Sequence, residues 1–156
     1  MKKLLLAAII SLSTISTAAL AEIKVGIILG FTGPIETLTP AMRDSAKLAF
    51  AEVSSSGKLL GGETITPMIG DSTCVDSDAA VAAAELLVND GVAAIMGADC
   101  SGVTGAIATN VAVPNGVTMV SPSATSPGLT SLADNGLFFR TAPSDAKVGK
   151  CLHKLH

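Results

Sequence analysis

The chain has 156 residues, of which 49% are hydrophobic, 15% are charged and 3% are aromatic, and its formal net charge is −3. This apolar content excludes an intrinsically disordered chain, because enough side-chain surface is available to offset the entropy lost on folding. Four Phe residues without Tyr or Trp, together with the acidic balance, disfavour a nucleic-acid partner. The length favours a single domain.

The amino-terminal residues predict a secretory signal peptide. Two lysines precede an apolar run at 4–12 with one serine, and Ala19-Leu20-Ala21 is a typical cleavage pattern. The run is too short to span a bilayer, which disfavours the alternative of a membrane helix. We therefore expect residues 1–21 to be removed after Ala21. The mature chain then starts at Glu22 and has a net charge of −5, since the segment removed carries two lysines and no acid.

After Glu22, short runs of β-branched residues alternate with segments of helical periodicity. We predict strands at 24–30, 65–71, 92–97, 117–121 and 137–141, and helices at 39–57, 76–91 and 101–113, with a short helix at 127–133. Thr39 is expected to cap the first helix, and Pro40 suits its first turn. Asp76 or Ser77 is expected to cap the second. This order predicts an α/β fold, a three-layer doubly wound parallel sheet with helices on both faces.

The last ten residues differ in composition from the rest of the chain. Residues 147–156 hold three lysines, both histidines and one of three cysteines, whereas residues 22–146 carry a net charge of −8. A truncated or frame-shifted gene end would explain this change, and a genuine basic helix is the alternative. We therefore take 22–146 as the domain and expect the tail to interrupt a helix that starts at Ser144-Asp145.

The usual catalytic and cofactor motifs are missing from the sequence. There is no G-x-x-x-x-G-K-[ST], no G-x-G-x-x-G after the first strand and no G-x-S-x-G. A secreted hydrolase using Ser101 or Ser123 would need a base, and the only histidines are His153 and His156 in the tail. We therefore expect no enzyme activity, no cofactor and no metal. Three carboxylates lie close together in the sequence: Asp71, Asp76 and Asp78. The end of a strand and the capping of a helix explain them better than a metal site does.

Two loops at the carboxyl ends of the predicted strands carry small hydroxyl residues. They are Cys100-Ser101-Gly102 and Ser121–Thr125, and each precedes a helix. Ligands of open α/β sheets bind beyond this edge, at a topological switch point. Hydroxyl groups and unpaired backbone N–H groups can hold an anion there without Lys or Arg. Plain helix capping is the simpler interpretation of each loop, but the two together favour a small anionic or zwitterionic ligand.

The cysteines favour a disulfide between two neighbouring strand ends. Cys74 follows the second predicted strand and Cys100 the third, and in an exported protein such a pair is oxidised by default. Two free cysteines are the alternative. Cys151 is left over in either case.

Several short motifs occur in a specific order over residues 23–146. They are Ile23–Ile27, Thr32-Gly33-Pro34, Val88–Val92, Met96-Gly97 with Cys100-Ser101, Val120–Pro127 and Phe139-Arg140-Thr141. The set resembles the first lobe of type I periplasmic binding proteins, in particular the branched-chain amino-acid (leucine/isoleucine/valine) binding components of ABC importers.

The resemblance implies a role for five residues. Ser101 and Thr125 would bind the α-carboxylate of an aliphatic amino acid through hydroxyl and backbone N–H groups. The carbonyl of Ser123 and the hydroxyl of Thr125 would accept hydrogen bonds from its ammonium group. Ala124 would line the floor of the site. Leu38 stands where family members often place an aromatic residue, and a Cys74–Cys100 bridge would match the disulfide of the family.

The resemblance also implies a periplasmic binding protein that delivers its ligand to an ABC permease in the inner membrane. Members of the family close a second lobe over the ligand, and no part of this sequence matches that lobe. Micromolar affinity needs about 8 kcal/mol, so we expect this chain to bind leucine weakly or not at all. A sensory ligand-binding domain and a binding protein for amides or short peptides remain the alternatives.

Overall fold

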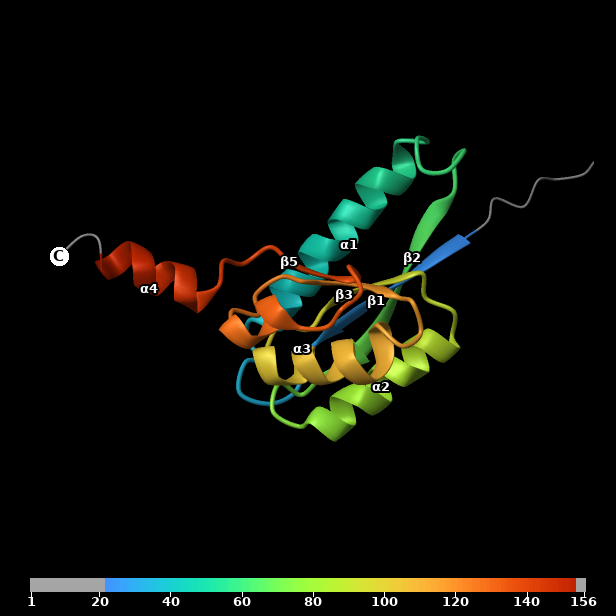
Figure 1. Ribbon diagram of the computed structural model, residues 1–156. Helices are drawn as coiled ribbons and strands as arrows, with labels where there is room; N and C mark the ends of the chain where they lie inside the picture. Colours follow the sequence, from blue (N-terminus) through green and yellow to red (C-terminus); the bar gives the residue numbers. More distant parts are fainter. Residues whose placement is uncertain (1–21, 154–156) are drawn as a thin grey trace, which may run out of the picture.

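Five parallel strands form one sheet in the order β2-β1-β3-β4-β5 (Figure 1). The structure, a computed structural model, describes residues 22–153, so the predicted signal peptide lies outside the described residues. The strands are β1 (Glu22–Leu29), β2 (Thr64–Asp71), β3 (Ala94–Gly97), β4 (Thr118–Ser121) and β5 (Phe138–Arg140). The helices are α1 (Thr39–Ser55), α2 (Ser77–Asn89), α3 (Ser101–Ile107), the π-helical η1 (Ala108–Ala112), the 3₁₀-helical η2 (Pro127–Ser131) and α4 (Asp145–His153).

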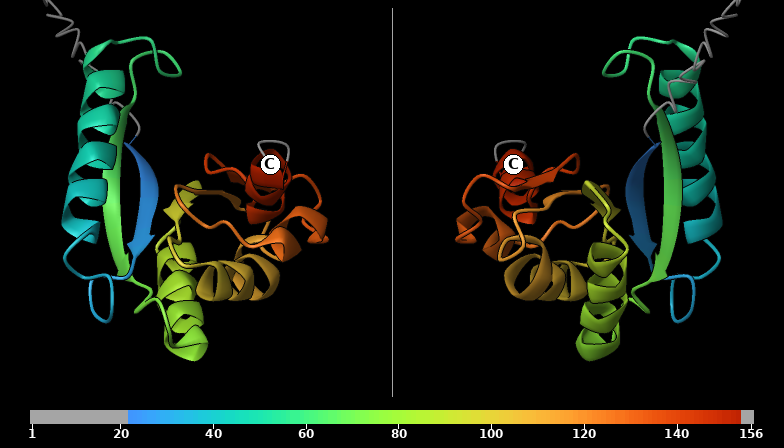
Figure 2. Two further views of the ribbon diagram at one scale, coloured as in Figure 1. Left: turned by 90° about the vertical axis from the view of Figure 1, so that its left-hand side faces the viewer. Right: turned by 90° about the vertical axis from the view of Figure 1, so that its right-hand side faces the viewer.

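The helices flank the sheet on both faces. Figure 2 shows α1 on one face of β1 and β2, and α2 and α3 on the other face of the sheet. The predicted doubly wound α/β architecture is therefore confirmed. From β1 the chain moves outward to β2 and then returns to β3 on the other side of β1. The carboxyl ends of β1 and β3 thus flank the topological switch point, where open sheets bind ligands.

Alternate residues of the strands feed two separate apolar clusters. Towards α2 and α3 the sheet contributes Ile28, Ile95, Met119 and Phe138, all of which are buried. Small residues of α2 allow that helix to lie close to the sheet, and the Leu87 side chain packs within 3.1 Å of where a Cβ on Gly26 or Gly70 would stand. Those two strand positions therefore favour glycine, because any side chain would displace Leu87.

On the opposite face of the sheet, α1 covers β1 and β2 (Figure 2). Ile27, Met96, Val120 and Phe139 pair in register across β1, β3, β4 and β5. Ile27 is fully buried beside Ala46 of α1, whereas Phe139 is 53% exposed. An apolar row therefore runs from beneath α1 to the solvent-exposed edge of the sheet.

Two local predictions need correction. Thr39 does not cap α1: Leu38 takes the N-cap position, and the buried Thr39 hydroxyl donates to the Gly30 carbonyl at 3.1 Å. This bond ties the start of α1 to the end of β1, a long-range requirement that a local pattern does not reveal. The second correction concerns the carboxyl-terminal residues, which continue α4 without interruption to His153. All residues of α4 are exposed, and the helix projects from the body (Figure 1).

Candidate functional site

The two hydroxyl-bearing loops meet directly above the carboxyl edge of the sheet. The Ser101 hydroxyl oxygen accepts hydrogen bonds from the backbone N–H groups of Thr125 and Ser126, each at 3.1 Å. The two predicted ligand residues Ser101 and Thr125 therefore lie side by side. The Ser101 hydroxyl hydrogen stays available to an acceptor outside the protein. The Thr125 N–H, in contrast, is engaged by Ser101, so only the hydroxyl of Thr125 is left as a donor.

The other predicted site residues differ in their exposure. Ser123 is exposed, and its hydroxyl donates to the Asp99 carbonyl at 3.0 Å. Ala124 is 1% exposed and donates its N–H to the Ser121 hydroxyl at 3.0 Å, so its methyl group packs into the core below the loop. Leu38 lies just before α1 and is 62% exposed.

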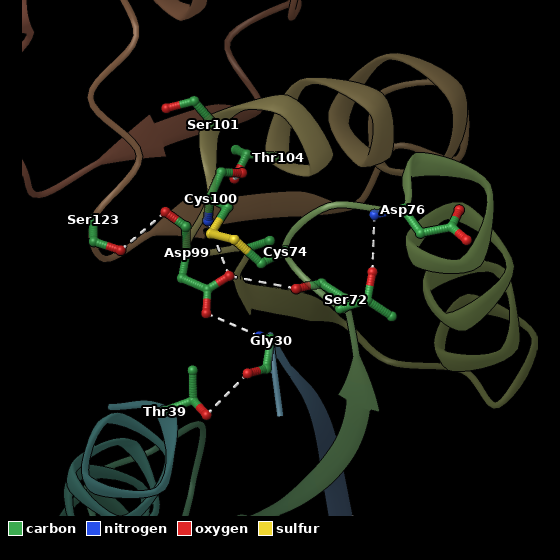
Figure 3. The surroundings of a disulfide bond; sticks show 12 residues. Gly30, Thr39, Ser72, Cys74, Asp76, Asp99, Cys100, Ser101, Thr104 and Ser123 are labelled. Carbon is green, nitrogen blue, oxygen red and sulfur yellow. Dashed lines mark hydrogen bonds between the residues drawn. A yellow bond between two sulfur atoms is a disulfide. The ribbon is translucent and has the colours of Figure 1, made fainter. Parts of the chain in front are cut away.

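Asp99 is a central residue of this edge that the sequence reasoning missed. Its side chain is buried (5% exposed) and accepts hydrogen bonds from the N–H groups of Gly30 and Cys100, both at 2.9 Å, and from the Ser72 hydroxyl at 3.4 Å. Figure 3 shows it between the loops that follow β1, β2 and β3. One signal in the sequence could have drawn attention to it, because a carboxylate two residues after a buried strand lies at the edge where open α/β sheets bind ligands.

A second carboxylate, Asp71, holds the loop that follows β1. It accepts the N–H of Phe31 at 3.0 Å, the hydroxyl of Thr32 at 2.6 Å and the N–H of Thr73 at 2.8 Å. Burial works to raise the pKa of Asp71, but the Thr32 hydroxyl and the backbone N–H groups of Thr73, Thr32 and Phe31 together hold it below its ordinary value. Asp76 caps α2, as predicted, through the N–H groups of Asp78 and Ala79. Within residues 22–153, no group of three His, Cys, Asp or Glu side chains is placed to hold a metal ion.

A disulfide fixes the position of the Ser101 loop. Cys74 and Cys100 are bonded, their Cα atoms 5.2 Å apart, and the bridge joins the loop after β2 to the N-cap of α3 (Figure 3). This is the pairing that the sequence favoured. Cys151 lies exposed on α4.

A guanidinium group also contacts the Ser123–Ser126 loop. Arg140 of β5 donates to the carbonyl of Ser126 at 2.8 Å, to that of Ala124 at 3.4 Å and to the Thr130 hydroxyl at 2.5 Å. The loop thus contacts Asp99 through Ser123 at one end and Arg140 through Ser126 at the other. Such a pair of charges suits a ligand that carries both signs.

A separate hollow of about 330 Å³ lies between η2 and α4. Its lining includes Pro127, Thr130, Ser144, Ala146, Lys147 and Lys150. Its lining does not include Ser101, Ser123 or Thr125, which we call the hydroxyl cluster. The wall of the hollow on the α4 side depends on a helix with no buried residue. We therefore locate the candidate site at the hydroxyl cluster. Among the helices of residues 22–153, none has the length and apolar content needed to cross a membrane.

Comparison with known proteins gives consistent matches. The family description "Periplasmic binding protein" matches residues 22–150. A Leu/Ile/Val-binding protein of Citrobacter freundii is 32% identical over 147 residues, 94% of this chain and 39% of that protein.

Solved structures show the same fold. A substrate-binding protein of a branched-chain amino acid transporter from Streptococcus pneumoniae, in complex with isoleucine, aligns with a TM-score of 0.72 and 29% identity over 81% of this chain and 35% of its own. A solute-binding protein from Rhodopseudomonas palustris, in complex with 4-hydroxybenzoate, aligns with a TM-score of 0.65 and 25% identity over 85% of this chain and 36% of its own. The chain thus spans less than two fifths of the length of each of these three proteins.

Proposed function

Since the chain belongs to the periplasmic binding protein family, we propose that it is the solute-binding component of an ABC importer for branched-chain or related aliphatic amino acids. The observation that carries this proposal is the contact between Ser101 and the Thr125 loop, beside the switch point, at the carboxyl ends of β3 and β4. Its role is capture and delivery rather than catalysis. An ABC permease in the inner membrane is its partner, and the periplasm, reached through cleavage after Ala21, is its location.

The site binds the charged head of an amino acid through hydroxyl groups. The Ser101 hydroxyl hydrogen and the Thr125 hydroxyl donate to the α-carboxylate, while the Ser123 carbonyl and the Thr125 oxygen accept from the ammonium group. The buried Ala124 holds the loop in place below the ligand. Leu38 offers apolar surface to the aliphatic side chain of the ligand from the opposite loop.

Affinity for the isolated chain is expected to be low. Micromolar binding needs about 8 kcal/mol and millimolar binding about 4 kcal/mol. A ligand held from one side keeps half of its surface in water, where its charged contacts are weakened. We therefore propose that this chain binds leucine with a dissociation constant in the millimolar range.

Titration by NMR and calorimetry tests the proposal. Leucine, isoleucine and valine should bind, and glucose should not. Ser101→Ala should weaken leucine binding about tenfold, because one charge-assisted hydrogen bond is lost. Ser131→Ala on η2, whose hydroxyl bonds only within its own turn at 3.3 Å, should leave binding unchanged and serves as the matched control.

The outcomes separate the proposal from its alternatives. Binding of amides or short peptides in preference to amino acids would replace the ligand class. Micromolar binding of leucine would contradict the reasoning from a single open lobe. Absence of any amino-acid binding at tens of millimolar would remove the transport function from this chain.

A further inference from the structure

Among residues 22–153, the buried carboxylate of Asp99 has no cationic partner. Within residues 22–153 the one ion pair joins Arg43 to Asp44 on α1. Asp99 is instead held by two backbone N–H groups and one hydroxyl. A buried charge without a counter-charge is costly to maintain, and part of that cost remains where only neutral dipoles face it.

Both oxygens of the Asp99 carboxyl group act as hydrogen-bond acceptors. Each of its oxygens accepts an N–H, from Gly30 and from Cys100, as an ionised carboxylate does. The backbone carbonyl of Asp99 also accepts the Ser123 hydroxyl at 3.0 Å, so Asp99 is a direct neighbour of the residue whose carbonyl would accept from the ammonium group of a ligand. Arg140 lies at the other end of the same loop.

We propose that Asp99 is a specificity-determining residue that makes the site select ligands with an ammonium group next to their carboxylate, and reject carboxylates that lack one. This inference rests on the proposed function. The charge acts through its field and without touching the ligand, since the side chain is almost fully buried. In the field of Asp99, attraction of the ammonium offsets repulsion of the carboxylate for a zwitterion, whereas for a simple carboxylate the repulsion from Asp99 has no such offset.

The fold itself does not impose this selection. The R. palustris protein with the same fold is in complex with 4-hydroxybenzoate, a carboxylate without an ammonium group. Residues that differ between proteins of this fold therefore decide which of the two ligand classes is bound. At an effective dielectric constant of about 20, a unit charge roughly 10 Å from a ligand carboxylate changes its dissociation constant by about tenfold.

The experiment compares L-leucine with 4-methylpentanoate, which has the same carbon skeleton but no ammonium group, by NMR titration of the full chain. The unmodified chain should bind leucine at least tenfold more tightly. In Asp99→Asn this ratio should fall by about tenfold. Asp90→Asn is the matched control, because Asp90 is exposed and precedes the amino-terminal end of β3, where the Lys24 ammonium group donates to its backbone carbonyl at 3.0 Å. The ratio of the two affinities should not change in this variant.

The ratio separates the effect of charge from loss of structure. If Asp99 only holds the loops, Asp99→Asn weakens both ligands by the same factor, and that result overturns the inference. Should the variant not fold, the unmodified chain still decides, since equal affinity for the two ligands overturns the inference as well. Binding of leucine with an unchanged ratio removes the inference alone, whereas binding of neither ligand removes the proposed function and the inference with it.

Discussion

Removal of the Cys74–Cys100 bridge should lower the stability of the chain by a predictable amount. The bridge closes a loop between residues 26 apart in sequence. The chain-entropy relation gives about 3.5 kcal/mol for a loop of this length. The unfolding entropy of residues 22–153 is about 0.28 kcal/mol/K, so the double variant Cys74→Ser, Cys100→Ser should unfold about 12 °C lower than the unmodified chain.

Thermal unfolding followed by circular dichroism measures this difference. Cys151→Ser is the control, because the exposed Cys151 forms no bridge and its replacement should leave the midpoint within about 1 °C. A reductant should lower the midpoint of the unmodified chain to that of the double variant. A decrease of less than about 3 °C in the double variant would refute the reasoning, since the bridge would then not restrict the unfolded chain as the relation requires.

Three further perturbations follow from single residues. Asp71 has a lowered pKa in the folded state, so its contribution to stability is complete above pH about 4 and is lost as the pH falls through the folded-state pKa. In urea unfolding, the difference in unfolding free energy between the unmodified chain and Asp71→Asn should therefore vanish at low pH. Gly33 has φ +95°, and a Cβ there would stand 2.4 Å from the Thr73 carbonyl oxygen. Gly33→Ala should therefore lower the free energy of unfolding by about 2 kcal/mol in the same assay. An unchanged free energy of unfolding would show that the first loop moves freely. Phe138→Ala should lower the free energy of unfolding by about 3 kcal/mol because Phe138 is 8% exposed, whereas Phe139→Ala should lower it by less than about 1 kcal/mol because Phe139 is 53% exposed. Equal losses would contradict the assigned faces of β5.

The sequence predicts the architecture well because its signals are local. Each buried strand is a short apolar run next to a helical segment, and small residues or glycines separate the two. Pairing of Cys74 with Cys100 follows from the parallel sheet, since both cysteines come directly after a strand. The contact of Ser101 with Thr125 follows for the same reason, because residues after neighbouring parallel strands meet at one edge.

What the sequence could not predict depends on contacts between distant segments. Thr39 looks like a helix cap, but its hydroxyl bonds the backbone of Gly30. The role of Asp99 depends on backbone N–H groups that carry no signature in the sequence. The composition of the tail pointed to an interrupted helix, whereas α4 continues to His153 in the structure.

One titration tests the central claim, that the charged head of an amino acid binds at the hydroxyl cluster above the sheet. The backbone amide signals of the ¹⁵N-labelled chain are followed while leucine is added. We predict saturable shifts that centre on Ser101 and on residues 123–126, with the signals of Lys147 and Lys150 unchanged. Shifts confined to the hollow between η2 and α4, with the signals of Ser101 and Thr125 unmoved at saturation, would contradict the account.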